Sequence, residues 1–207
     1  MIKVDLHTHS TLSKDGGISA TGYERFLKKQ LDQVAITDHD QIDFALELNR
    51  SLGDKVIVGS EISTSEGHLI GLFLQEKIKA GMSVAKTSEA IREQGGIVYL
   101  PHPNDLYRHG IDMNSYDESM FDIVEKFNAR SFNHPTIYYK IPKAVGSDAH
   151  SRFEVGRTFN KVSSLLTAEN IIGELDKATY SYQQVNVLYR LAPSYHRTRK
   201  FLTKSLS

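Results

Sequence analysis

The chain has 207 residues, no cysteine, 40% hydrophobic residues, and 25 basic residues balanced by 25 acidic ones. This composition is ordinary for a globular domain; it excludes a disulfide framework, and no apolar run approaches the roughly 18 residues of a membrane span. The start of the chain lacks the form of a signal peptide, so we expect a cytoplasmic protein with one packed domain.

Short apolar, β-branched runs alternate with segments of helical period, a pattern typical of βα units. The expected strands are Ile2–Leu6, Gln33–Thr37, Val56–Ser60, His68–Leu74, Ile97–Leu100, Asp122–Phe127 and Lys143–Gly146. The expected helices are a segment capped by Ser19 that runs to Gln30, then Asp40–Leu52, Ser83–Gln94 and Glu169–Lys177. This order predicts an α/β barrel over residues 1–160, completed by a helical region with a basic tail over residues 161–207.

The C-terminal region has an uneven charge. Residues 188–207 contain no acidic residue and five basic ones: Arg190, Arg197, Arg199, Lys200 and Lys204. A solvated basic helix or tail is the plain interpretation. Contact with a polyanion or with a partner subunit is the alternative, and the oligomeric state stays open.

Metal-binding side chains follow the expected strands. They lie in Asp5-Leu6-His7-Thr8-His9, Thr37-Asp38-His39, Gly59-Ser60-Glu61, Pro101-His102-Pro103 and Ser147-Asp148-Ala149-His150. Because a parallel barrel gathers the carboxyl ends of its strands at one mouth, we expect these side chains to converge. Imidazole and carboxylate ligands suit Zn²⁺, Mn²⁺ or Fe²⁺. The sequence therefore predicts a metalloenzyme.

The individual residues differ in what they indicate. His7 and His9 are two apart, so in an extended strand both rings share one face. Glu61 has two oxygens and could bridge two ions. Asp15 lies in an Asp-Gly turn, which is also a sufficient structural explanation. His68 opens a strand, where a lone histidine is more often structural than a ligand.

Taken together, the motifs resemble a known family. They are Asp5-Leu6-His7-Thr8-His9-Ser10, Ser13-Lys14-Asp15-Gly16, Ile36-Thr37-Asp38-His39-Asp40, Gly59-Ser60-Glu61-Ile62-Ser63, His102-Pro103 and Gly146-Ser147-Asp148-Ala149-His150. In this order they resemble the signature of the PHP (polymerase and histidinol phosphatase) domain, over residues 1–156. The resemblance implies a distorted seven-stranded (β/α)7 TIM-like barrel, a trinuclear metal centre and phosphoester hydrolysis.

The resemblance also implies an assignment of ligands to two or three divalent ions (Mn²⁺, Zn²⁺ or Fe²⁺). His7, His9, Glu61 and Asp148 would hold the first ion. Glu61 would bridge to a second ion with His68 and His102, and Asp15, His39 and His150 would hold a third. Metal-bound hydroxide would attack the phosphoryl group, and Glu61, Asp148 and His39 are the residues that we expect to be catalytic.

Substrate contacts are expected from a smaller set. The resemblance places Asn128 near the site, and the nearby Arg130 is the first candidate for a phosphate contact, before Lys14, Arg108 and Arg152. His109 and His134 are candidates for the general acid. The segment between His68 and His102 is too short for the cap domain of some family members. We therefore expect a small phosphomonoester such as a nucleotide or sugar phosphate, or an exposed end of a larger substrate; no membrane partner is expected, and a nucleic acid is not indicated.

Two other functions remain open. Barrels with a histidine-rich metal mouth also hydrolyse lactones and amides, although no strand here ends in an obvious lysine suited to carbamylation. Domains of this type can also lose ligands and become non-catalytic binding modules, but the ligand set here is complete.

Overall fold

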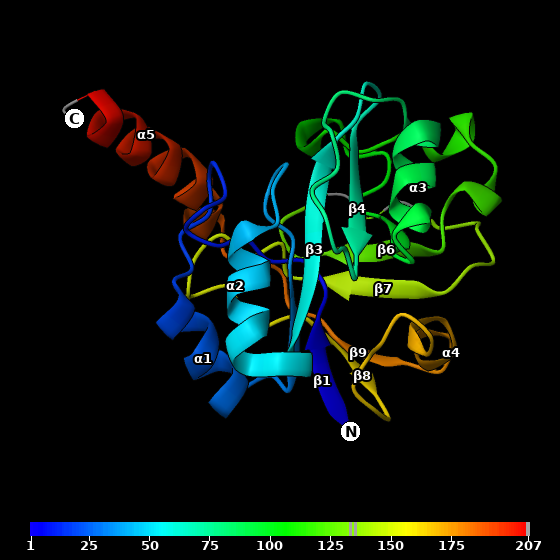
Figure 1. The fold of residues 1–207 in the computed structure, drawn as a ribbon, viewed down its shortest axis with the longest axis horizontal. Coiled ribbons are helices and arrows are strands. Elements are labelled where there is room, and N and C mark those ends of the chain that lie inside the picture. The colour runs from blue at the N-terminus through cyan, green and yellow to red at the C-terminus, as the bar shows by residue number, and fades with distance from the viewer. Residues whose placement is uncertain (133, 135, 206–207) are drawn as a thin grey trace.

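The computed structural model describes residues 1–132, 134 and 136–205, and its strands form a single mixed sheet. The strands are β1 (Ile2–Asp5), β2 (Gln33–Ile36), β3 (Val56–Ser63), β4 (His68–Leu72), β5 (Ile97–Leu100), β6 (Ile123–Asn128), β7 (Lys143–Gly146), β8 (Phe159–Val162) and β9 (Thr179–Ser181). Their spatial order is β7-β6-β5-β4-β3-β2-β1-β8-β9, and the sheet curls into a nearly closed barrel (Figure 1).

The described residues also form five α-helices: α1 (Ala20–Lys29), α2 (Asp43–Leu52), α3 (Val84–Glu93), α4 (Ile171–Asp176) and α5 (Ala192–Ser205), of which α5 projects away from the sheet (Figure 1). Short 3₁₀ turns are η1 (Gly53–Lys55), η2 (Leu106–Arg108), η3 (Met113–Ser115), η4 (Glu118–Met120) and η5 (Val187–Leu191). Serine begins two of the helices as expected, because Ser19 Oγ accepts from Gly22 N and Ser83 Oγ accepts from Lys86 N. No helix in the described part of the chain combines the length and apolarity needed to cross a membrane.

The α/β class is confirmed, but the expected strand count of seven is wrong. All seven expected strands exist, and β8 and β9 bring the described strands to nine. The barrel is also mixed, because β4 runs antiparallel to β3 and β5, and β8 runs antiparallel to β1. Residues 161–207 thus contribute strand as well as helix, and the domain division at residue 160 stays a prediction.

A buried asparagine closes the gap between the two halves of the barrel. In β8, Asn160 donates from Nδ2 to Val4 O of β1 (3.1 Å) and to Val145 O of β7 (2.9 Å). Its Oδ1 accepts from Val145 N (3.0 Å). One side chain therefore satisfies main-chain groups of two strands that do not pair with each other in the sheet.

The apolar interior lies on the same strand faces as the polar site described below. Ile57 precedes Glu61 by four residues in β3, and Ile70 and Leu72 alternate with His68 in β4. These apolar side chains belong to one buried cluster with Tyr99 of β5. The strands therefore carry packed hydrophobic side chains at one end of the barrel and charged ones at the other.

Candidate metal centre

Strand ends from all around the barrel supply the polar side chains of one buried site. The carboxyl ends of β1, β2, β5 and β7 lead into His7 and His9, His39, His102, and Asp148 and His150. Glu61 lies within β3, beside His39 in an isolated parallel bridge. His68 reaches the same place from the start of β4, because β4 is antiparallel to its neighbours. His68, at the start of its strand, thus lies at the same end of the barrel as the histidines that follow the ends of the other strands.

Alternation along the chain after β1 explains the first pair of histidines. The rings of His7 and His9 lie on the same side, with centroids 5.3 Å apart. Thr8 between them turns the other way, where its Oγ1 donates to Ala35 O (2.7 Å) and accepts from the buried Tyr23 hydroxyl (2.9 Å). The outward threonine fixes the main chain that presents both rings.

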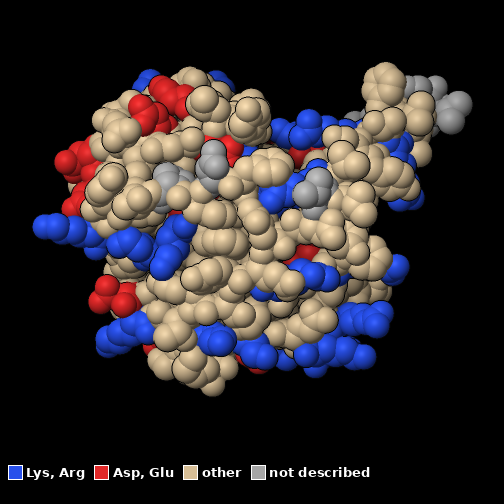
Figure 2. Space-filling view, turned by 180° about the vertical axis from the view of Figure 1, so that it is seen from behind, with Lys and Arg blue, Asp and Glu red and all other residues tan. Residues whose placement is uncertain are grey.

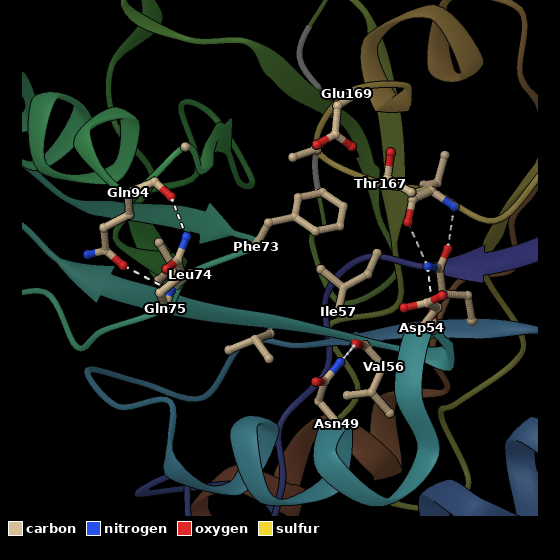
Figure 3. Close-up of a pocket in the computed structure, with 15 residues that line it drawn as sticks. Asn49, Asp54, Val56, Ile57, Phe73, Leu74, Gln75, Gln94, Thr167 and Glu169 are labelled. Carbon is tan, nitrogen blue, oxygen red and sulfur yellow. Dashed lines mark hydrogen bonds between the residues drawn. The ribbon is translucent and has the colours of Figure 1, made fainter.

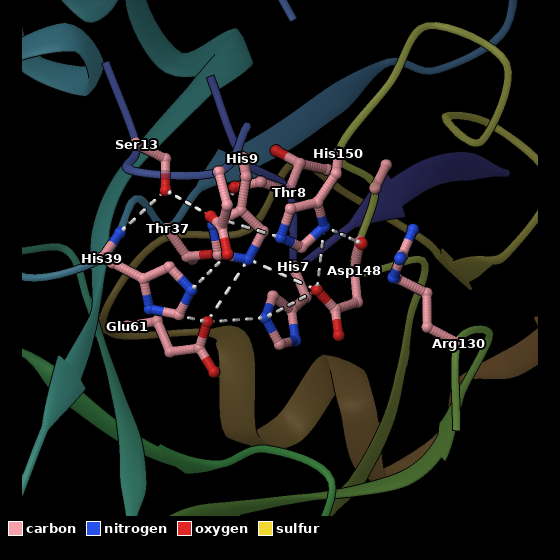
Figure 4. A network of polar contacts seen from close by, with 12 residues as sticks. His7, Thr8, His9, Ser13, Thr37, His39, Glu61, Arg130, Asp148 and His150 are labelled. Atoms are coloured by element: carbon pink, nitrogen blue, oxygen red, sulfur yellow. Dashed lines mark hydrogen bonds and ion pairs between the residues drawn. The ribbon is translucent and has the colours of Figure 1, made fainter. Parts of the chain in front are cut away.

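Glu61 lies at the centre of the site, and its two oxygens face different imidazoles. Figure 4 shows the oxygen that faces His7, His9 and His39. Oε1 lies 2.8 Å from His68 Nδ1 and 2.9 Å from His102 Nε2. Oε2 lies 3.4 Å from His7 Nε2, 3.3 Å from His9 Nε2 and 3.5 Å from His39 Nδ1. This division of five rings between two oxygens is the geometry that a bridging carboxylate requires.

Two aspartates complete the ring of expected ligands. Asp148 Oδ1 lies 3.3 Å from His9 Nε2, and Asp15 lies between His39 Nε2 (3.5 Å) and His150 Nε2 (3.4 Å). The contacts of Asp15 show that the Asp-Gly turn after β1 also carries a side chain into the site.

All nine expected ligands belong to groups whose donor atoms lie within 4.8 Å of one another. The groups are His9, Asp15, His39 and His150; His7, His102 and Asp148; His7, His9 and Glu61; and His39, Glu61 and His68. The first group contains the three residues expected to share one ion, with His9 added. Which residues share which ion stays a prediction.

Unsatisfied buried atoms indicate that these residues fit metal ions. Among the described residues, both ring nitrogens of His9, Nδ1 of His39 and Oδ1 of Asp148 are buried and lack a hydrogen-bond partner of good geometry. Buried polar atoms are rarely left in this state without an unseen ion or water. His9 Nε2, His39 Nδ1 and Asp148 Oδ1 each lie within 3.5 Å of another expected ligand, and this set of nitrogen and oxygen donors suits divalent transition metals.

For Glu61 and His150 the electrostatics favour the form that binds metal, whereas Asp148 and Glu61, against the effect of burial, raise the pKa of His9 to about 9 and favour its protonated form. Burial alone would raise the pKa of Glu61, but the rings of His39, His68 and His7 hold that pKa well below its usual value. Burial, together with the neighbouring His9, lowers the pKa of His150 to about 3. An ionised carboxylate and a neutral imidazole are the forms in which these groups coordinate a metal.

Glu125 of β6 contacts two of the expected ligands, and the sequence motifs did not identify it. Its Oε1 lies 3.2 Å from His7 Nδ1 and accepts from the Tyr99 hydroxyl (3.0 Å), and its Oε2 accepts from His102 N (2.7 Å). A Cβ on Gly146 would lie 2.2 Å from Glu125 Oε1 and 2.8 Å from His7 Cβ, so this approach requires glycine. The available signal was an acidic residue inside an apolar strand, Ile123-Val124-Glu125.

The expected substrate contacts have different surroundings. Asn128 is buried, and its Nδ2 donates to Glu125 Oε2 (3.0 Å) and Asp148 Oδ2 (3.1 Å). Arg130 is also buried, but its guanidinium pairs with Glu154 and donates to Arg190 O (2.9 Å). Lys14 is exposed on the loop that carries Asp15. The substrate roles of all three stay predictions.

Among the weaker candidates, Arg108 lies closest to the centre, because its Nη2 pairs directly with Asp148 Oδ2. His109 is exposed, with its ring centroid 5.2 Å from that of His68. His134 instead stacks on Phe127 at 4.2 Å. Of the two candidates for the general acid, His109 therefore has the contact with the metal-ligand set.

A cleft of about 430 Å³ lies around the start of β3, at the end of the barrel opposite to the metal centre (Figure 3). Its polar side chains bond to neighbouring main chain: Asn49 Nδ2 donates to Val56 O (2.7 Å), and Gln94 Oε1 accepts from Gln75 N (2.9 Å). The polar side chains Asn49 and Gln94 therefore have a structural role, because they hold neighbouring main chain in place.

Comparison with known proteins finds relatives by sequence, whereas no protein-family model matches the chain. The chain is 37% identical over 178 residues to the uncharacterised protein MJ0417 of Methanocaldococcus jannaschii. The aligned region covers 79% of this chain and 72% of the relative. The chain is also 37% identical over 142 residues to MJ1587 of the same organism, covering 62% and 82%. A 5′-3′ exoribonuclease of Haemophilus influenzae is 34% identical over 123 residues, covering 56% and 43%.

Solved structures share the fold at lower identity. A two-domain protein from Bacteroides vulgatus containing a predicted PHP-like metal-dependent phosphoesterase matches with a TM-score of 0.67 and 17% identity, over 95% of this chain and 69% of that chain. The lesion-specific endonuclease EndoQ of Pyrococcus furiosus matches with a TM-score of 0.62 and 16% identity, over 86% and 57%. At these identities the likeness is one of fold.

Proposed function

The chain belongs to the same family as the Methanocaldococcus jannaschii proteins MJ0417 and MJ1587, and we propose that it is a metal-dependent phosphoesterase of the PHP type. The observation that carries this proposal is the Glu61 carboxylate, whose two oxygens face five imidazoles in a buried site with two further carboxylates. Structures that share the fold include a predicted metal-dependent phosphoesterase and an endonuclease, which supports this proposal, and also an amidohydrolase from Chromobacterium violaceum, so hydrolysis of an amide or lactone stays the alternative.

We assign the nine ligands to three ions. His7, His9, Glu61 and Asp148 would hold the first, Glu61, His68 and His102 the second, and Asp15, His39 and His150 the third. Divalent ions held there would supply a hydroxide nucleophile at neutral pH and positive charge against the phosphoryl oxygens. Glu61, Asp148 and His39 are the ligands that we propose to be catalytic, and each contacts members of more than one group.

Other side chains position the ligands or contact the substrate. Asn128 Nδ2 holds Asp148 Oδ2 and thereby fixes the direction of Oδ1. Arg130 pairs with Glu154, which accepts from His150 N (3.0 Å), so Arg130 supports the loop of that ligand. Arg108 reaches Asp148 from the surface with a side chain that is 21% exposed. We propose that Arg108, with Lys14 at the rim, binds phosphate oxygens.

One preparation can test the proposal. Purified protein should contain two to three transition-metal ions per chain by elemental analysis, lose hydrolysis after chelation and regain it with Mn²⁺, Zn²⁺ or Fe²⁺. The same sample should be assayed with phosphomonoesters, phosphodiesters and lactones, and we expect phosphoesters to be the substrates. Full activity without metal would overturn the proposal, and so would hydrolysis of lactones alone.

A further inference from the structure

A large cleft adjoins the metal centre on the side of the C-terminal helix. It measures about 1240 Å³ and lies between α1, the loop after His150, and the segment of η5 and α5. Three arginines line it, Arg25, Arg152 and Arg199, and the described residues around it include no aspartate or glutamate. In Figure 2, Lys and Arg side chains gather near the base of the projecting C-terminal helix. The cleft therefore presents positive charge without a counter-charge of its own.

Aromatic rings are the second feature of this cleft. Phe153 and Tyr189 stack with centroids 5.4 Å apart and planes 15° apart. The Arg152 guanidinium carbon lies 4.8 Å from the Phe153 centroid. Phe153 is 49% exposed and Tyr195 is 63% exposed, so ring surface remains open to a ligand. Stacked aromatic rings beside arginines are the features that bind unpaired bases and their phosphates.

The cleft lies beside the loops that carry two of the expected metal ligands. Its lining includes Gly17 and Ser151, which are close in the chain to the ligands Asp15 and His150. Helix α5 crosses the same rim, because Arg197 Nη2 lies 3.0 Å from Asp15 Oδ2 and Lys200 Nζ lies 2.9 Å from Gly16 O. A chain lying in the cleft would thus have a short path to the ligands.

We propose that this cleft binds a single-stranded nucleic acid and leads one of its phosphates to the metal centre, an inference that rests on the proposed phosphoesterase function. The volume exceeds the roughly 300–1,000 Å³ of pockets that hold one small molecule. Arginines that are not neutralised by acids match the phosphates, and the exposed rings match unpaired bases, which a duplex would keep stacked inside. The basic C-terminal helix is then part of the substrate path.

Binding can be measured without catalysis. A fluorescein-labelled single strand of about ten nucleotides should bind the chelator-treated protein in a fluorescence anisotropy titration, more tightly than a blunt duplex of the same sequence. Phe153→Ala, Tyr189→Ala and Arg199→Ala should each raise Kd at least about fivefold. Arg50→Ala, at an exposed arginine of α2, is the matched control and should leave Kd within about twofold. Phe153→Leu keeps apolar bulk without the ring and should also weaken binding, so the test survives if an alanine variant misfolds.

Two results would overturn the inference: single strand and duplex binding equally with the ring variants unaffected, or no binding of the single strand at all. The proposed phosphoesterase function has a separate readout, which is hydrolysis of p-nitrophenyl phosphate and its diester by the metal-loaded protein. Binding without hydrolysis would refute the function, whereas hydrolysis without cleft-dependent binding would refute only this inference. If both hold, cleft variants should lower kcat/KM for the oligonucleotide more than for the small ester.

Discussion

Glu125 Oε1 lies 3.2 Å from His7 Nδ1, on the opposite side of the ring from the nitrogen that faces Glu61. A carboxylate in this position fixes the tautomer and the orientation of a ligating imidazole and makes it a stronger donor. Tyr99 and Asn128 hold Glu125 in turn, at 3.0 Å each. The first ligand of the proposed centre is therefore supported from β5 and β6, across the barrel from its own strand.

The first prediction follows from this support. Glu125→Gln places an amide where four nitrogen or hydroxyl groups contact the carboxylate, so it should weaken the hold on His7 and reduce metal affinity about 10–100-fold. Competition with a chelating dye measures the affinity directly. Glu47→Gln, at an exposed position of α2, is the matched control. Unchanged affinity in a folded Glu125→Gln protein would mean that Glu125 does not support the metal site.

The secondary-structure elements that could be predicted from the sequence are those whose signal lies in neighbouring residues. Strands such as β3, expected over Val56–Ser60 and observed over Val56–Ser63, and helix caps such as Ser19 are encoded by neighbouring residues. Strand β8 was not expected, because its sequence Phe-Asn-Lys-Val has no apolar run. It forms through Asn160, which bonds to β1 and β7, and that tertiary contact leaves no local pattern.

The same reasoning applies to the site. The convergence of the nine expected ligands was predictable, because eight of them lie in, follow or open a recognisable strand and Asp15 stands in its place in the order of motifs. Arg130 was expected at the substrate because it lies close to Asn128 in the sequence. Its guanidinium pairs with Glu154, which lies 24 residues further along the chain. Glu125 escaped notice because a single acid in a strand is common. The roles of Arg130 and Glu125 depend on contacts with residues far away in the sequence, and a single sequence does not show which residues these are.

The second prediction concerns His68. His68 Nδ1 lies 2.8 Å from Glu61 Oε1, and its side chain is 11% exposed. If it is a ligand, His68→Ala should remove about one equivalent of metal and lower kcat more than about 100-fold, since a lost ligand costs more than a lost supporting bond. Elemental analysis and a melting curve on one preparation decide the matter. Full metal content with only a lower Tm would make His68 structural.

The third prediction tests Glu61 as a bridge. Glu61→Gln keeps the shape of the side chain but removes the negative charge that faces five imidazoles. Metal content and phosphoester hydrolysis should fall together, while circular dichroism should still report the folded barrel. The Glu47→Gln protein again provides the reference. A folded Glu61→Gln protein with the wild-type metal stoichiometry would show that the bridge is assigned to the wrong residue.

The last prediction concerns pH and Asp5, a fully buried carboxyl below the metal ligands. Burial raises its pKa to about 7 from the usual 3.8, although donors including Ser147 N (3.1 Å) and His7 N (3.3 Å) oppose the rise. Between these two pH values the folded state holds a proton that the unfolded state has released. The free energy of unfolding should therefore fall as pH rises through this window, by up to about 4 kcal/mol.

Asp5→Asn removes this titration, because an amide stays neutral at every pH in the window. In chelator-treated protein, denaturant unfolding at pH 5 and pH 8 should show the variant gaining stability relative to wild type as pH rises. Glu47→Gln should follow the wild-type curve, since its carboxyl is exposed. Comparing differences between proteins cancels the titration of all other groups. Parallel curves for wild type and Asp5→Asn would mean that Asp5 is already ionised in the folded protein at pH 5, with its charge balanced by the nearby imidazoles rather than removed by protonation.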